Sequence, residues 1–348
     1  FLAAVGAEAD PATGGRQMPC HYSDVHLNIA SSSSAVATQF LQAVGAAEAG
    51  TKISRVPGLR DLVPSFDEDE IVLVCGGEGQ TSEGEFWESL NTACNLSLPV
   101  VFVIEDNEYA ISVPVEVQTA GGSISKLVSG FPNLYLVECD GTDIVDVYRA
   151  AGSAISHARE QRAPAFIHAH CTRPHSHSMS DDERAYRTKK ERAAQDLRDP
   201  ITRTSVLLLE SQTATAEELK DLELEIEAEV ASAADKALAS PQPGPETAML
   251  HLFSEDCDPT SSDFDTEDDP QYGNDSLLTM VDLLNACIKS EMERDPRITV
   301  FGQDIADASR EEALSEVKGK GGVFKVTHGL QKRFGSERVY NTPLAEAN

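Results

Sequence analysis

The sequence has few basic residues and no long apolar run. Lysine and arginine together number 28 against 58 aspartates and glutamates in 348 residues, which leaves a net charge of -30. This charge repels phosphate backbones and anionic lipid, so we expect no nucleic-acid partner. No stretch approaches the roughly 18 to 20 apolar residues of a membrane span, so we expect no membrane partner.

Cysteines are few and irregularly placed. The seven are scattered, several lie inside apolar runs, and none has CxxC spacing. Structural zinc sites and redox motifs use close cysteine pairs, and small secreted domains use paired disulfide frameworks. We therefore expect a reducing, cytoplasmic setting without structural zinc.

The length and the 41% hydrophobic content suffice for about two domains with buried cores. The sequence begins with phenylalanine rather than methionine and stops at NTPLAEAN, which has no tail-like composition. We expect truncation at both ends.

Short apolar runs alternate with segments of helical periodicity. The runs are IVLVC (71–75), PVVFVI (99–104), LYLVEC (134–139) and AFIHAH (165–170). Such alternation predicts an α/β fold, a doubly wound parallel sheet with helices on both faces. Asp143 is expected to cap the helix before the fourth run.

The composition changes after a predicted amphipathic helix that begins with the capping box of Thr215 and Glu218. Residues 238–275 are rich in proline, serine and acid, a composition typical of a solvated linker. A helical pattern and the strand-like RITVFG (297–302) follow. We expect a first domain at 1–237, a linker at 238–275 and the start of a second α/β domain at 276–348.

A glycine-rich turn, GGEG, follows the first apolar run. A strand that enters a glycine turn and then a helix directs backbone N–H groups at an anion. Glu78 in that turn would repel a bare phosphate, unless a divalent cation lies between them. The motif is neither a P-loop nor a GxGxxG fingerprint. Alone, it is equally well explained as a strand-to-helix turn with a solvated glutamate.

A second polar turn makes the interpretation of GGEG as a cation site more specific. The run PVVFVI leads into EDNEYAIS, so Asn107 stands at the end of the next predicted strand. Neighbouring strand ends then offer a carboxylate, an amide oxygen and a backbone carbonyl to one shared cation.

These two turns resemble the thiamin-diphosphate-dependent 2-oxo acid dehydrogenases, specifically their first, decarboxylating component. GEG at 77–79 and the Asn-containing turn match the family's cofactor motif, and Glu in place of Asp is the branched-chain pattern. The resemblance implies a thiamin diphosphate-binding fold in which Glu78, Asn107 and the main chain of Tyr109 bind Mg2+. It also implies that the diphosphate is lined by Gly77, Gly79 and Gln80.

The segment 28–47, NIASSSSAVATQFLQAVGAA, resembles the Ser-rich cofactor segment of branched-chain α subunits. The resemblance implies that Ser34 and Val36 contact the cofactor. Possible potassium ligands are Ser33, Ala35, Thr38 and Gln39, although the family often has proline at the position of Ala35. Without the neighbouring motifs, the stretch is a flexible serine run before a helix.

The segment 170–201 resembles the family's active-site loop, with HSMSD at 177–181. Histidine suits a group that carries a proton near neutral pH, so His177 is the expected catalytic residue. Ser178 occupies the position that is phosphorylated in mitochondrial relatives. A metal site at His168, His170 and His175 is the weaker alternative, because HxH is common by chance.

The last segment resembles the start of the family's β subunit through VFGQDIA, GGVFKVTHGL and RVYNTPLAEAN. The resemblance implies that Glu346 is catalytic and binds the cofactor by a hydrogen bond to its aminopyrimidine ring. Gln303 departs from the family, which usually has Glu there, so an acid-base role at that position is in doubt.

The resemblance covers nearly all of residues 10–205 and 276–348 and implies a natural α–β fusion. The implied reaction is oxidative decarboxylation of a 2-oxo acid of the 2-oxoisovalerate type. The implied partners are a lipoyl-bearing acyltransferase and a second copy of the fused chain. Three alternatives stay open: a pyruvate or acetoin enzyme, a transketolase-like ligase, and a scaffold subunit without catalysis.

Overall fold

The computed structural model describes most of the chain. Outside the described residues lie 19, 20, 22, 32, 54, 179, 180, 186, 251, 253, 255, 259, 263–277, 303, 310, 323 and 343–348. The chain divides into two compact units, one formed by Phe1–Ser34 with Ala214–Leu278 and the other by Ala35–Thr213 with Thr279–Asn348. Each unit is described by itself.

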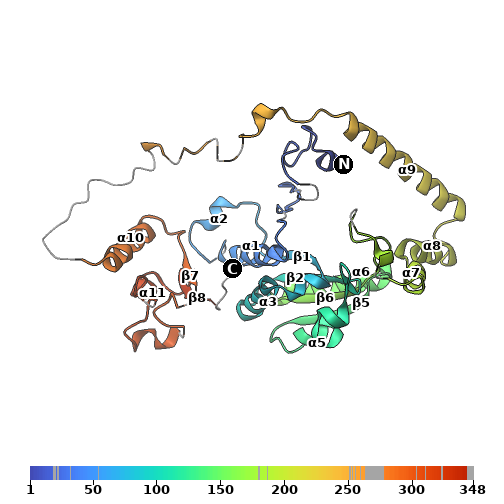
Figure 1. Cartoon of the computed structure of the whole chain (residues 1–348). Coiled ribbons are helices and arrows are strands. Elements are labelled where there is room, and N and C mark those ends of the chain that lie inside the picture. Colours follow the sequence, from blue (N-terminus) through green and yellow to red (C-terminus); the bar gives the residue numbers. More distant parts are fainter. Residues whose placement is uncertain are drawn as a thin grey trace. The chain divides into compact units, whose positions relative to one another are not determined.

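The second unit contains a parallel sheet of four strands in the order β1-β2-β6-β5 (Figure 1). The strands are β1 (Val72–Gly77), β2 (Val100–Asp106), β5 (Tyr135–Asp140) and β6 (Ala165–His170). All four predicted strands are confirmed. The first extends two residues further than predicted, because Gly76 and Gly77 pair with Ile104 and Glu105 of β2.

Helices cover both faces of this sheet, as predicted. One face packs against α1 (Thr38–Ile53), α3 (Gly84–Leu96) and α5 (Ile124–Val128), and the other against α6 (Ile144–Gln161). Side chains alternate along β2, so Phe102 joins the first core and Val101 the second. Asp143 caps α6 by accepting from the backbone N–H groups of Val145 and Asp146, as expected.

Aromatic rings fill the first core. Phe40 and Phe86 meet edge to face with centroids 5.3 Å apart, and both are fully buried. Trp87, the single tryptophan of the chain, stacks on Phe131 at 6.3 Å. Burial of such rings contributes a large share of the apolar surface removed from water in this core.

Shorter elements complete the second unit. Around the sheet lie α2 (Leu59–Leu62), β3 (Tyr109–Ala110), β4 (Val113–Pro114), α4 (Val115–Gln118), α7 (Lys189–Asp196) and α8 (Pro200–Glu210). The 3-10 turns of this unit are Glu78–Ser82, Ala120–Gly122, Glu183–Ala185 and Glu311–Ser315.

The last part of the second unit has a smaller core. Strands β7 (Val300–Gly302) and β8 (Val339–Asn341) pair in parallel. Helix α10 (Met280–Arg294) precedes β7 in the chain, and α11 (Leu330–Phe334) precedes β8. Met292, Leu330 and Val339 are buried together. The expected start of a second α/β domain is thus present, although β7 is shorter than the predicted strand.

The first unit contains α9 (Ala216–Ala239) and 3-10 turns at Ala3–Val5 and Pro245–Thr247. The predicted capping box of Thr215 and Glu218 is present. Ile226 and Val230 on α9 remain 50% and 47% exposed, so this helix buries little of its apolar stripe within the described residues. No helix in the described ranges is long and apolar enough to cross a bilayer.

Helix α8 is joined to the end of β5 by a charged cluster. Arg203 Nη1 donates to Asp140 Oδ2 at 2.8 Å, and the Thr142 hydroxyl donates to Asp140 Oδ1 at 2.6 Å. Burial raises the pKa of Asp140, but the hydrogen bonds from Thr142 and Arg203 outweigh it and hold the pKa well below its usual range. The charged form of Asp140 therefore stabilises the fold.

We expect Asp140→Asn to lower the free energy of unfolding near neutral pH and to matter less in acid. A depressed folded pKa gives stability that is present above the unfolded value of about 3.9 and is lost as pH falls below it. Urea unfolding of both proteins between about pH 6 and pH 2.5 measures the difference. Arg203→Gln should reduce the same pH dependence, whereas a difference that does not change with pH would contradict the assignment.

Candidate functional site

The turn after β1 is shaped by two close approaches. A Cβ on Gly76 would lie 2.5 Å from both Gln80 Oε1 and the ring of Phe40, and a Cβ on Gly79 would lie 2.7 Å from Ala110 Cβ. Glycine at both positions therefore lets the turn 76–80 fold tightly against α1 and β3. The sequence motif GGEG is a packing requirement here as well as a candidate anion cradle.

Glu78 stands in this turn and is only 3% exposed. Its Oε1 accepts a hydrogen bond from the Thr119 hydroxyl, while Oε2 is buried without a hydrogen-bond partner among the described residues. Burial raises the pKa of Glu78; the Thr119 bond lowers it and the charge of Asp106 raises it again. A buried carboxylate oxygen without a donor is costly, and a hard cation would satisfy it.

The turn after β2 presents Asn107 and Tyr109 at the same edge of the sheet. Gly77 and Glu105 are register partners in neighbouring parallel strands, so the residues that follow each strand emerge side by side. Asn107 Oδ1 accepts the backbone N–H of Tyr109 at 3.2 Å. Glu108 between them has φ +68°, a left-handed conformation that side-chain-bearing residues seldom adopt.

Gln80 connects the glycine turn to α1. Its Oε1 accepts from Gln39 Nε2 at 2.7 Å and from the Gly77 backbone N–H at 3.2 Å. Gln39 also donates to the Cys75 carbonyl at 3.3 Å. Gln39, which the sequence resemblance implies as a possible potassium ligand, is therefore hydrogen-bonded to the turn that carries Glu78.

The other residues of the Ser-rich segment are placed separately. Thr38 Oγ1 donates to the Ala35 carbonyl at 2.9 Å, and Val36 is half exposed. Ser33 and Ser34 belong to the first unit, where the Ser34 hydroxyl bonds His21 Nε2. Glu346 and Gln303 lie outside the described residues.

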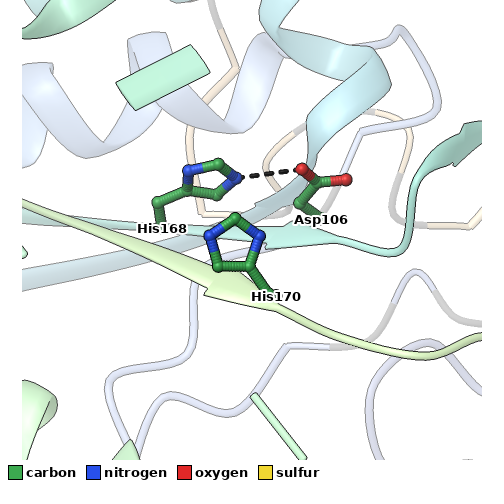
Figure 2. Close-up of side chains that lie close together, drawn as sticks. All are labelled: Asp106, His168 and His170. Carbon is green, nitrogen blue, oxygen red and sulfur yellow. Dashed lines mark hydrogen bonds and ion pairs between the residues drawn. The ribbon is translucent and has the colours of Figure 1, made fainter. Parts of the chain in front are cut away.

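A histidine network around the buried His168 borders the same edge (Figure 2). The structure brings together His168 and His170, two of the three histidines in the weaker metal alternative, and the contact of His168 with Asp106 was not anticipated from sequence. His168 is fully buried in β6; its Nε2 lies 3.0 Å from Asp106 Oδ2 and its Nδ1 lies 2.7 Å from Ser125 Oγ. His170 Nε2 lies 3.0 Å from Glu138 Oε2. The alternation in HAH, which places both rings on one face of the strand, was the available signal.

The loop with the predicted catalytic histidine is tied to Tyr109. His177 has an exposed side chain, and its backbone N–H donates to Asp181 Oδ2 at 2.9 Å. Arg187 is buried, with its guanidinium carbon 4.8 Å from the centre of the Tyr109 ring. The Tyr109 hydroxyl donates to Glu191 at 2.9 Å. Arg187 and Glu191 were not singled out from sequence.

Family models match most of the chain. Residues 1–246 match "Dehydrogenase E1 component", and residues 277–348 match "Transketolase, pyrimidine binding domain".

Curated relatives carry two kinds of name. The chain is 34% identical to the 2-oxoisovalerate dehydrogenase subunit alpha of Bacillus subtilis (strain 168), over 71% of this chain and 70% of that protein. It is 33% identical to a human mitochondrial pyruvate dehydrogenase E1 component subunit alpha, somatic form, over 54% of this chain and 48% of that protein. The human mitochondrial 2-oxoisovalerate dehydrogenase subunit alpha is 32% identical over 69% of this chain and 51% of that protein. The chain thus spans about half the length of these human relatives.

We expect Gly79→Ala to destabilise the fold by about 1 to 3 kcal/mol, because its Cβ would overlap Ala110 Cβ. The double variant Gly79→Ala/Ala110→Gly should recover part of that loss. Urea unfolding of the two single variants and the double variant gives the coupling free energy. Gly77→Ala is the matched control, since a Cβ there meets no atom within 4 Å. Additive effects of the two substitutions would show that the contact is not the cause.

Proposed function

Because this chain belongs to the dehydrogenase E1 component family, we propose that it decarboxylates a 2-oxo acid with thiamin diphosphate. The acyl group passes to the lipoyl group of an acyltransferase partner. The observation that carries this proposal is the buried Oε2 of Glu78, which has no hydrogen-bond partner among the described residues. It lies at the carboxyl edge of a parallel sheet, where ligands of such sheets bind.

The donor set fits a magnesium diphosphate. Glu78, the Asn107 amide oxygen and the Tyr109 carbonyl would hold Mg2+, since all three offer the hard oxygen ligands that this ion prefers. Gly77, Gly79 and Gln80 would line the diphosphate through the backbone of the turn. When bound, thiamin diphosphate supplies the electron sink for the carbon–carbon bond that breaks.

Other residues complete the proposed site. Ser34 and Val36 would contact the cofactor, and Glu346 would accept a hydrogen bond from its pyrimidine ring. Potassium would be bound by Ser33, Ala35, Thr38 and Gln39. This last assignment is supported by the bond between Thr38 and the Ala35 carbonyl, which already folds the segment into a tight turn.

His177 would hold and donate a proton near the reacting carbonyl. Its loop is held to the cation-binding turn by the stacking of Arg187 on Tyr109 and by the bond from Tyr109 to Glu191. An exposed imidazole on such a loop can reach a substrate, and histidine can both accept and donate a proton.

For the substrate, we propose a branched-chain 2-oxo acid. Support comes from Glu rather than Asp at position 78, from YAIS at 109–112, and from the Bacillus relative, whose name refers to 2-oxoisovalerate. Pyruvate is the second candidate, favoured by HSMSD at 177–181 and by a relative of nearly equal identity whose name refers to pyruvate.

The assembly and compartment are part of the same proposal. A dimer of the fused chain and a lipoyl-bearing acyltransferase would complete the enzyme, in a cytoplasmic setting. The six cysteines that the structure describes are all free, which supports a reducing environment. A non-catalytic scaffold would be favoured instead if the full chain failed to bind thiamin diphosphate in the presence of Mg2+.

We expect the complete protein that contains these 348 residues, given thiamin diphosphate and Mg2+, to decarboxylate 2-oxoisovalerate with higher kcat/KM than pyruvate. An assay with an artificial electron acceptor measures both rates. Glu78→Gln should lose about 100-fold or more in kcat/KM, because the amide cannot supply the charge that a divalent cation requires. A clear preference for pyruvate would overturn the branched-chain assignment and leave the reaction class intact.

We expect His177→Asn to lower kcat about 100- to 10,000-fold, the range for loss of a positioned proton donor, while cofactor binding changes little. Steady-state kinetics together with calorimetric titration of thiamin diphosphate separate the two effects. His175→Asn, two residues away on the same exposed loop, is the matched control and should keep most of the activity. Equal losses in both variants would assign the effect to the loop rather than to His177.

A further inference from the structure

The carboxylate of Asp106 connects the cation-binding turn to the neighbouring strand. Its Oδ1 accepts the backbone N–H of Glu108 at 2.8 Å, and its Oδ2 lies 3.0 Å from His168 Nε2. The Asp106 carbonyl accepts the backbone N–H of Cys171 at 2.7 Å. One buried residue therefore fixes both the end of β2 and the turn that carries Asn107.

The backbone conformation of the turn 107–109 needs stabilisation by groups outside it. Glu108 has φ +68°, which L residues rarely adopt, and the Asp106 carboxylate is the group that caps its N–H. If the carboxylate rotates, the N–H of Glu108 loses its acceptor and the backbone of 107–109 can relax. Asn107 and Tyr109 would then no longer direct their oxygens to one point.

His168 sets the orientation of that carboxylate. The ring is fully buried, and a carboxylate only accepts hydrogen bonds, so Nε2 must carry a proton. Nδ1 is held by the Ser125 hydroxyl at 2.7 Å, which fixes the rotation of the ring. A chain of hydrogen bonds thus runs from Ser125 on α5 through His168 to Asp106 and the turn. Hydrogen-bond partners outside a metal's own ligands orient those ligands in the same way.

A cation bound inside the histidine cluster is the competing explanation. Asp106, His168 and His170 offer ligand atoms within 4.8 Å of one another (Figure 2). Both nitrogens of His168 already have side-chain partners, and His170 Nε2 bonds Glu138. A cation that used either nitrogen of His168, or Nε2 of His170, would have to displace one of these bonds. The network is therefore better explained as complete without a cation.

We propose that His168 is a positioning residue that acts through Asp106 to hold the turn 106–109 in its cation-binding conformation. The inference rests on the proposed function, because it requires the Mg2+ site of Glu78, Asn107 and Tyr109. Neither His168 nor Ser125 touches the cofactor in this proposal; their effect is on the affinity for Mg2+.

The test is the Mg2+ dependence of thiamin diphosphate binding, measured by titration calorimetry on the full chain without substrate. His168→Met removes the donor at similar size and should raise the Mg2+ concentration for half-maximal binding at least about tenfold. His168→Gln retains an amide donor and should recover most of that loss. His170→Gln, on the same strand and without a hydrogen bond to Asp106, is the matched control and should keep the wild-type requirement.

The outcomes are distinguishable. Absence of Mg2+-dependent binding by the wild type would refute the proposed function and this inference together. A wild-type Mg2+ requirement in His168→Met, or an equal increase in His170→Gln, would overturn the inference alone. So would stoichiometric binding of Zn2+ that both variants abolish. Thermal unfolding without cofactor checks the fold of each variant. If His168→Met does not fold, Ser125→Ala decides, and an unchanged Mg2+ requirement there overturns the inference.

Discussion

The proposed site depends on one buried carboxylate oxygen that has no hydrogen-bond donor among the described residues. Glu78 Oε2 has no partner in the described part of the chain, while Oε1 takes the hydroxyl of Thr119. Burial of an unpaired charged oxygen opposes folding, and a bound cation reverses the sign of that contribution. A ligand that brings its own divalent ion would therefore bind with an added favourable free energy, because the ion would pair with Oε2.

The surrounding fold makes this unfavourable burial possible. Parallel pairing of β1 with β2 brings the two turns to one edge, and the glycines at 76 and 79 let the first turn lie against the ring of Phe40 and against Ala110. Gln39 and Gln80 satisfy the polar groups next to the turn. The turn borders the aromatic core at Phe40, and close packing in such a core resists rearrangement around it.

The sequence predicted the features that depend on local patterns of residues. Apolar runs located the four strands, capping residues located α6 and α9, and parallel strand ends predicted that Glu78 and Asn107 lie at one edge. It did not predict the contacts of Ser125, His168 and Asp106, because these residues come from three separate segments and meet only after packing. The position of Arg187 over the Tyr109 ring was not predicted either, because cation–π contacts follow no fixed spacing in a sequence. The β1 extension arose from backbone pairing, which the glycines' low strand propensity concealed.

The single tryptophan has a practical meaning for spectroscopy. Trp87 stacks on Phe131 beside the aromatic core of the second unit, and the first unit contains no indole. Intrinsic fluorescence excited at the red edge of protein absorption therefore reports on the sheet and α3 alone. Far-ultraviolet circular dichroism also registers α9, so a comparison of the two signals tests whether the two units unfold together.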